Sequence, residues 1–148
     1  VASTSVGQSL AKEGSYDYTN CHSGVEHASM SIDAKHQASI REFTGTIRAA
    51  TPGTFLDMSS YQCISLNNSL GSQAAVSIVC VTVDKDGDRL YTRFTGDGLT
   101  SEAGTISGTG KYVGIERTGK TVSLGTFPSA KPGTFQTCLR NTGTYKFK

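Results

Sequence analysis

The apolar residues of this chain recur at every second position in short runs, and glycine, serine, threonine and asparagine separate the runs. Alternation of this kind is typical of β-strands that bury one face. Residues 75–83 (AVSIVCVTV) are apolar on both faces and rich in β-branched side chains, which favours a central strand covered on both sides. The other candidate strands are SYDYT (15–19), EFTGTIR (42–48), SYQCISL (60–66), RLYTRF (89–94), GKYVGI (110–115), KTVSLGTF (120–127), FQTCL (135–139) and TYKFK (144–148).

These runs amount to about eight strands, with turn signals at spacings near ten residues. The pattern predicts an all-β, mostly antiparallel fold, either a meandering barrel or a sandwich, and it lacks the alternating helices of a parallel α/β fold. The clearest local signal is Asp86-Gly87, a dipeptide that suits a two-residue type I′ turn. We therefore expect a hairpin between residues 75–83 and 89–94.

One segment departs from the strand pattern. Residues 31–43 (SIDAKHQASIREF) begin with Ser31, a good helix cap, and continue with apolar residues at helical spacing. The predicted face consists of Ile32, His36, Ile40 and Phe43. The spacing predicts one short helix here, and any helix in the chain is expected in this region.

Length and charge exclude several classes. The 148 residues predict one domain, with residues 1–13 as a flexible N-terminal segment and residues 14–148 as the β domain. The 14 basic and 12 acidic residues are scattered, so nucleic acid is not an expected partner. No apolar run approaches the ~20 residues that cross a bilayer, so we expect no membrane insertion. The small, polar start at Val1 fits a mature, exported protein, periplasmic or extracellular.

The four cysteines are even in number and lack zinc-ligand spacing, which favours two disulfides in an oxidising compartment over a metal site. Cys63 and Cys80 are equidistant from a turn centred between Gly71 and Ser72, so a symmetric hairpin would bring them face to face. Cys21 and Cys138 would then join the first strand to one near the C-terminus. The alternatives are Cys21–Cys63 with Cys80–Cys138, or four reduced thiols.

Three motifs have structural rather than chemical interpretations. Residues 114–121 match the phosphate-loop pattern GxxxxGK[ST], but Gly125, Pro128 and Pro132 prevent the helix that this site needs, so no nucleotide is expected. Residues 84–88 (DKDGD) lack the spacing of a calcium loop and fit a turn with solvated aspartates. The third is the polar cluster His22, Glu26, His27 and His36. In a strand these side chains would not point to one place, so we interpret the histidines as solvated or hydrogen-bonded.

The C-terminal half resembles a known group of proteins. The segments DKDGDRLYTRFTGDG, GTISGTGKYVGIERTGK and GTYKFK, with Gly108-Thr109-Gly110-Lys111-Tyr112 at their centre, resemble small exported bacterial proteins of unknown role. Those proteins are similar to the barrel superfamily that contains allene oxide cyclases and dirigent proteins. The resemblance covers about residues 80 to 148 and implies an eight-stranded barrel. It carries over no active-site residue.

A closed eight-stranded barrel is wide enough for packed side chains or for one small ligand. Our leading hypothesis is therefore an exported carrier or sensor of a small apolar molecule, without a cofactor. The residues expected to line the ligand site are Val76, Ile78, Tyr91, Phe94, Val122 and Leu124.

Two other classes of function remain open. One is a surface antigen or interaction module, whose barrel is filled by its own side chains and whose protein partner the sequence does not identify. The other is a cyclase-like or isomerase-like enzyme, in which a carboxylate or tyrosine in an apolar cavity stabilises charge. The candidates for that role are Glu26, Glu42, Tyr16 and Tyr18.

Overall fold

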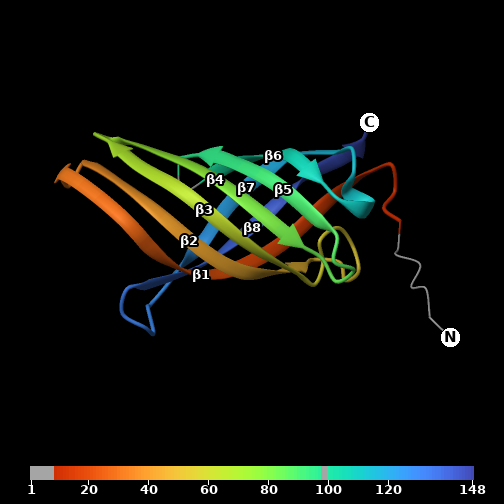
Figure 1. Cartoon of the computed structure of the whole chain (residues 1–148), viewed down its shortest axis with the longest axis horizontal. Coiled ribbons are helices and arrows are strands. Elements are labelled where there is room, and N and C mark those ends of the chain that lie inside the picture. The colour runs from red at the N-terminus through yellow and green to blue at the C-terminus, as the bar shows by residue number, and fades with distance from the viewer. Residues whose placement is uncertain (1–8, 98–99) are drawn as a thin grey trace.

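The computed structural model describes residues 9–97 and 100–148, and within them eight antiparallel strands form one closed barrel (Figure 1). Each strand pairs with the next in the chain, and the last pairs with the first. The meandering barrel predicted from the sequence is thus confirmed. The strands are β1 (Glu13–Asp33), β2 (His36–Ala49), β3 (Ser59–Leu70), β4 (Gln73–Val83), β5 (Arg89–Gly96), β6 (Thr100–Gly108), β7 (Ile115–Phe127) and β8 (Thr134–Phe147).

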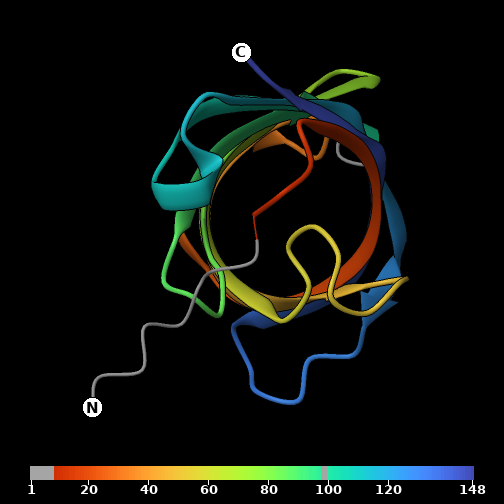
Figure 2. The ribbon, with the colours of Figure 1, turned by 90° about the vertical axis from the view of Figure 1, so that its right-hand side faces the viewer.

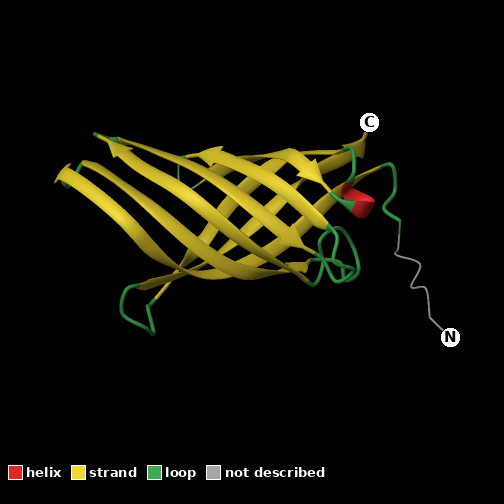
Figure 3. Cartoon of the chain, viewed as in Figure 1, coloured by secondary structure: helices red, strands yellow, loops and turns green. Residues whose placement is uncertain are grey.

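Helix is almost absent from the described residues, as Figure 3 shows. The one helical element among them is the 3-10 turn η1 (Gly110–Tyr112). No helix in residues 9–97 and 100–148 is long and apolar enough to span a membrane.

The proposed N-terminal segment, residues 1–13, lies only partly within the described residues, because residues 1–8 fall outside them. Glu13 already belongs to β1 and pairs with Lys146 of β8. Leu10 is partly buried and packs against the core. The sheet therefore begins one residue earlier than the expected domain boundary.

The prediction of a helix over residues 31–43 is wrong. These residues form the end of β1, a tight turn and the start of β2. The Asp33 carboxylate fixes the turn, since it accepts the backbone N–H groups of Lys35 (2.8 Å) and His36 (3.0 Å). Beyond the turn Ile40 pairs with Leu66 of β3 and points outward. The neighbouring strands thus supply hydrogen bonds that override the helical spacing of the apolar residues.

Asp86-Gly87 does lie at the tip of the β4–β5 hairpin, as predicted, but in a longer loop than a two-residue turn. The loop spans residues 84–88, and only Gly87 has a positive φ (86°), whereas a type I′ turn needs two such residues. The Asp84 carboxylate organises the loop by accepting the N–H groups of Asp86 (2.9 Å) and Asp88 (3.1 Å).

The aspartates of this loop are not all solvated. Asp84 is buried, accepts the Tyr112 hydroxyl (2.8 Å) and pairs with Lys111 (2.9 Å), which also pairs with Asp86. The acidic loop therefore holds η1 against the end of the barrel. The pairing of its aspartates with Lys111 and its buried hydrogen bonds give this loop a structural role.

Aromatic packing closes one end of the barrel. The β2–β3 loop crosses that end (Figure 2) and buries Phe55 in the interior. Its ring lies 5.2 Å from that of Tyr16 and 5.0 Å from that of Tyr145, measured between centroids. Gly119 and Gly143 make room for Tyr16, because a Cβ at either position would lie 2.1 or 2.4 Å from the tyrosine oxygen. These rings form one part of the buried core, which continues along the barrel to Phe43 and Tyr61.

Both disulfides form with the favoured pairing, Cys63–Cys80 and Cys21–Cys138, and the alternative connectivity is wrong. Each bond joins residues that face each other on neighbouring strands, with Cα atoms 4.1 Å apart. One links β3 to β4 about the turn between Leu70 and Gln73, and the other fastens β1 to β8 where the barrel closes.

The two bonds are expected to differ in what they contribute to stability. Cys21–Cys138 closes a separation of 117 residues and Cys63–Cys80 one of 17, so the chain-entropy model gives about 4 to 5 against about 3 kcal/mol. The variant C63A/C80A keeps only Cys21–Cys138, and C21A/C138A keeps only Cys63–Cys80. Urea unfolding of each variant, oxidised and reduced, measures what its remaining bond contributes. A larger loss on reducing C21A/C138A would contradict this order.

Candidate functional site

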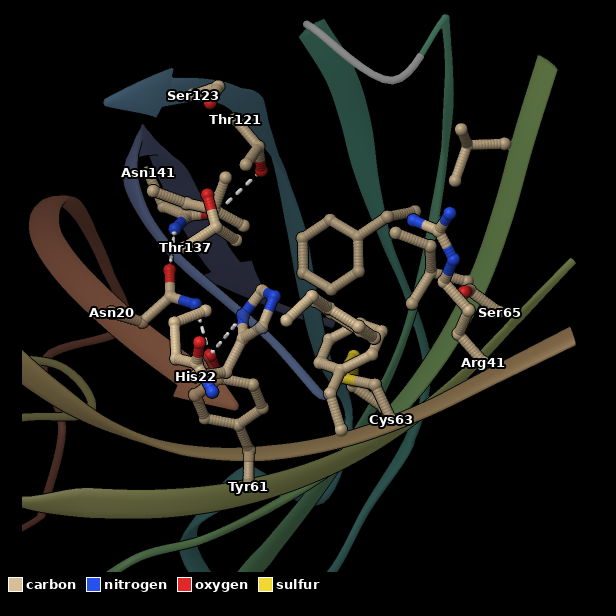
Figure 4. A pocket seen from close by; sticks show the side chains of 18 of the residues that line it. Asn20, His22, Arg41, Tyr61, Cys63, Ser65, Thr121, Ser123, Thr137 and Asn141 are labelled. Carbon is tan, nitrogen blue, oxygen red and sulfur yellow. Dashed lines mark hydrogen bonds between the residues drawn. A yellow bond between two sulfur atoms is a disulfide. The ribbon is translucent and has the colours of Figure 1, made fainter. Parts of the chain in front are cut away.

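The other half of the barrel is hollow. It contains a cavity of about 420 Å³ that opens at the end remote from Phe55, and Figure 4 shows part of its wall. Side chains from β1 to β5, β7 and β8 point into it. The cavity is mainly apolar, with a group of polar side chains around Asn20 and His22 on one side and with Arg41 and Ser65 on the other. Its principal lining residues are Tyr18, Asn20, His22, Phe43, Tyr61, Val76, Ile78, Phe94, Arg117, Thr121, Phe135 and Asn141.

The structure divides the six residues predicted to line a ligand site. Val76, Ile78 and Phe94 line the cavity. The other three lie outside its lining, and each is exposed: Tyr91, Val122 and Leu124. The reason is strand parity, because Leu90 and Thr92 of β5 and Arg117 and Thr121 of β7 face inward and leave their neighbours outside.

Aromatic rings form a clamp on one wall of the cavity. The His22 imidazole stacks on Phe43 with centroids 4.2 Å apart and meets the edge of Phe135 at 6.0 Å. Arg41 lies over Phe135, with its guanidinium carbon 5.2 Å from the ring centroid. These rings come from β1, β2 and β8, which closure of the barrel brings together. A flat apolar ligand would find ring faces on this side.

A chain of hydrogen bonds crosses the interior beside the clamp (Figure 4). Thr121 donates to the Asn141 carbonyl, and the Asn141 amide donates to the carbonyl of Asn20. The Asn20 amide in turn donates to the Tyr61 hydroxyl, which lies 2.9 Å from Nδ1 of His22. Four strands thus contribute to one buried polar network, and every member has a partner.

Gly45 makes the contact between His22 and Tyr61 possible. The register places Gly45 between them, opposite His22 on β1 and opposite Tyr61 on β3. A Cβ at this glycine would lie 2.7 Å from the tyrosine oxygen and 2.8 Å from the Cβ of His22. The absence of a side chain therefore lets two residues two strands apart touch across the inner face.

Burial strongly affects the ionisation of this pair. Desolvation lowers the pKa of His22 to about 4, so the imidazole is neutral in the folded protein near neutral pH. Burial also raises the pKa of Tyr61 far above its usual range, which keeps the phenol protonated. The cavity thus presents neutral hydrogen-bonding groups at the His22 wall.

Arg117 supplies a buried positive charge to the cavity, whereas Arg41, the other arginine of its lining, is partly exposed and pairs with Glu26. The Arg117 side chain is only 3% exposed, donates to the Tyr18 hydroxyl (2.9 Å) and lies 4.6 Å above the centroid of Tyr16. Phe55 and Phe94 also lie within 6 Å of the guanidinium carbon. Within the described part of the chain no carboxylate pairs with Arg117, and its Nε has no hydrogen-bond partner. Ring faces compensate the charge only in part, so an anionic group would be stabilised beside it.

The other acid–base candidates lie elsewhere. Glu42 is exposed and bonds to His27 (2.7 Å) and Gln62 (2.7 Å), while Glu26 pairs with Arg41 at 3.4 Å. Of the two candidate tyrosines, Tyr18 lines the cavity, whereas Tyr16 belongs to the packed end. The remaining member of the polar cluster, His36, pairs with Asp33 in the β1–β2 turn. Of the four nominated residues, only Tyr18 therefore lines the cavity.

No metal or phosphate site emerges from the residues that the structure describes. They contain no group of three histidine, cysteine, aspartate or glutamate residues arranged to hold a metal ion. Residues 114–121, the phosphate-loop match, run into the extended strand β7 without a following helix, as their sequence context predicted.

Sequence reasoning missed Arg117 and the polar network. The alternation that predicted the strands also shows which residues of a strand face inward. Tyr16 and Tyr18 face inward, so Asn20 and His22 on the same strand must also face inward. A polar residue at an inward position is the feature that marks the site.

The shifted pKa of His22 makes the stability of the protein depend on pH. From pH 6.5 down to about 4 the unfolded chain binds a proton at this residue that the folded chain does not, so the free energy of unfolding falls as the pH falls. We expect a loss on the order of 3 kcal/mol from this group over that range. Urea titrations of wild type and His22→Phe at several pH values measure it.

His27→Phe is the matched control, since His27 is exposed on the outer face. Its pH slope should resemble that of the wild type, whereas His22→Phe should flatten the slope between pH 6.5 and 4. Equal slopes in all three proteins would show that His22 is not buried in its neutral form.

The comparisons with known proteins address the fold. No protein-family model matches the sequence, and no curated protein sequence matches it either. Among solved structures, the barrel is similar to the pterocarpan synthase dirigent protein GePTS1, with a TM-score of 0.63 over 95% of this chain and 99% of that one. The two sequences are 13% identical. The resemblance noted in the C-terminal half therefore extends to the whole barrel, and the chain has the fold of the dirigent-like barrel proteins.

Proposed function

We propose that the protein binds a small, largely apolar molecule inside the open half of the barrel, with an anionic end of that molecule beside Arg117. The observation that carries this proposal is the cavity of about 420 Å³ with a buried, carboxylate-free arginine among the described residues of its wall. Val76, Ile78 and Phe94 provide apolar contacts, and ligand sites of this size are typically apolar with few polar groups.

The division of the interior supports a binding role over a filled barrel. Phe55 and its aromatic neighbours already fill the closed end and supply a core. The open half adds Phe43 and Tyr61 to that core, yet it also buries Arg117, whose Nε has no hydrogen-bond partner among the described residues, which costs stability. A ligand that pairs with this guanidinium would account for that arrangement. The structural likeness to a dirigent protein is compatible with binding of a small molecule and does not identify it.

Two further parts of the proposal concern the setting of the protein. Its four cysteines are all bonded, which indicates an oxidising environment, and we propose export to the periplasm or the cell exterior. A surface role as an antigen or interaction module is compatible with ligand binding. An enzymatic role would have to use groups that line the cavity, such as Tyr18 or His22, because neither nominated carboxylate belongs to the lining: Glu42 bonds to His27 on the outer face, and Glu26 pairs with Arg41.

Two dyes test the proposed ligand chemistry. N-phenyl-1-naphthylamine is neutral and apolar, and 8-anilinonaphthalene-1-sulfonate adds one anionic group to the same rings. We expect both to bind with enhanced fluorescence, and Ile78→Trp to weaken both by at least about tenfold because the indole fills the cavity. Ile64→Trp is the matched control, since Ile64 is 58% exposed on the neighbouring strand.

The charge of Arg117 is tested by the ratio of the two affinities. Arg117→Met should shift that ratio at least about tenfold towards the neutral dye, because it removes the partner of the sulfonate. Near-ultraviolet circular dichroism confirms that each variant keeps its fold. If Ile64→Trp and Ile78→Trp weaken the dyes equally, binding is at the surface and the proposed function is wrong.

A further inference from the structure

We propose that His22 selects ligands carrying a hydrogen-bond acceptor such as a carbonyl oxygen, because the buried network leaves its Nε2–H as a fixed donor facing the cavity. This inference rests on the proposed function and deepens it by naming a chemical class of ligand. Tyr61 acts as a positioning residue, which sets the orientation and the tautomer of the imidazole.

The directions of the hydrogen bonds in the network indicate which atom donates between Tyr61 and His22. Thr121 has a single donor, which it gives to Asn141, and each asparagine then passes an amide hydrogen to the next oxygen. Since the Asn20 amide donates to the oxygen of Tyr61, the phenol's own hydrogen is free to donate to His22. Among the described residues the Tyr61 oxygen has two partners, the Asn20 amide and Nδ1 of His22 at 2.9 Å, so Nδ1 is the acceptor available to the phenol's hydrogen.

The tautomer follows from this bond. A neutral imidazole carries one hydrogen, so an accepting Nδ1 places the hydrogen on Nε2. Desolvation favours the neutral ring, as the lowered pKa of His22 indicates. With a hydrogen on Nδ1, the Tyr61 oxygen would accept from both Asn20 and His22, and the phenol's own hydrogen would have no acceptor among the described residues.

The Nε2 atom is available to a ligand. His22 is 8% exposed and lines the cavity, and among the described residues its ring has one hydrogen-bond partner, at Nδ1. Stacking on Phe43 and the edge contact with Phe135 hold the plane of the ring (Figure 4). The opposite side of the ring from Tyr61 therefore presents a donor of fixed direction among apolar ring faces.

A donor of fixed direction discriminates between ligands, because a ligand without an acceptor leaves the N–H without a hydrogen bond. An oxygen acceptor restores the hydrogen bond that water would make, whereas a hydrocarbon of the same shape buries the N–H without a partner. The ketone should therefore be preferred over its hydrocarbon isostere. The expected preference is about three- to tenfold in affinity.

The tautomer is measured first, in the ligand-free protein. Nitrogen-15 NMR of uniformly labelled protein distinguishes a protonated from an unprotonated ring nitrogen. For His22 we expect protonated Nε2 and unprotonated Nδ1 at pH 7. The reverse tautomer would make Nδ1 the donor to Tyr61 and leave Nε2 without a hydrogen, and it would overturn the inference without any effect on the proposed function.

Selectivity is measured with 2-acetylnaphthalene and 2-isopropylnaphthalene, which differ mainly in the replacement of the carbonyl oxygen by a methyl group. The readout is the ratio of their dissociation constants in competition with N-phenyl-1-naphthylamine. Wild type should favour the ketone, and His22→Phe should bring the ratio close to one while keeping an aromatic ring at this place. Tyr61→Phe removes the donor to Nδ1, so the imidazole hydrogen can lie on either ring nitrogen and the ratio should fall. The outer-face variant His27→Phe should leave the ratio unchanged.

The outcomes separate the two proposals. If both naphthalenes bind with equal affinity in wild type, the acceptor preference is wrong and the apolar site stands. If Arg117→Met removes the preference and His22→Phe does not, the arginine rather than the histidine recognises the oxygen, which also overturns the inference. If neither naphthalene nor either dye binds, the proposed function fails, and the inference fails with it.

Discussion

The hydrogen-bonded ladder between β1 and β8 is the constraint on which the rest of the structure depends. It runs from Glu13 opposite Lys146 to Val25 opposite Thr134, and it turns an open meander into a cylinder. Closure leaves no edge strand and gives every strand an inner face. The Cys21–Cys138 bond lies within this ladder and ties the first strand to the last. Without closure, the inward residues of β1 and β7 would not share one interior.

Closure also creates a volume that the side chains fill unevenly. At one end the β2–β3 loop inserts Phe55 among inward tyrosines, and glycines on β7 and β8 accept the ring of Tyr16. At the other end smaller residues such as Val76, Ser65 and Thr121 leave space. One end therefore supplies the packing that holds the barrel, which leaves the other end free to differ in chemistry.

The open end contains polar groups that a core would not tolerate without partners. The side chains from Thr121 to His22 are hydrogen-bonded to one another. Neighbouring strands supply the first two bonds, and the glycine at position 45 allows the contacts with Tyr61. Arg117 is different, because it relies on ring faces and one tyrosine hydroxyl. The contrast between a satisfied network and a charge without a carboxylate indicates where a ligand would contribute most.

The sequence by itself determined most of the strands, the β4–β5 hairpin tip and the Cys63–Cys80 pairing, whereas β6 was not expected and residues 110–114, expected as part of a strand, form η1 and a turn. Each correct prediction follows from a period of two along the chain or from symmetry about one turn, which are local properties. The alternation along β1 also places Asn20 and His22 on the same inner face as Tyr16 and Tyr18. The helix expected over residues 31–43 failed because hydrogen bonds from β3, remote in sequence, outweigh local helical spacing.

Only the tertiary structure decided what meets inside the barrel. The contact of His22 with Tyr61 depends on Gly45 between them, and that of Arg117 with Tyr18 joins residues 99 positions apart. Tyr91, Val122 and Leu124 fell outside the cavity lining because one step in strand register reverses every side chain. Periodicity fixes which residues share a face, but the stagger of strands around a closed barrel fixes their neighbours, and that stagger is a property of the whole sheet.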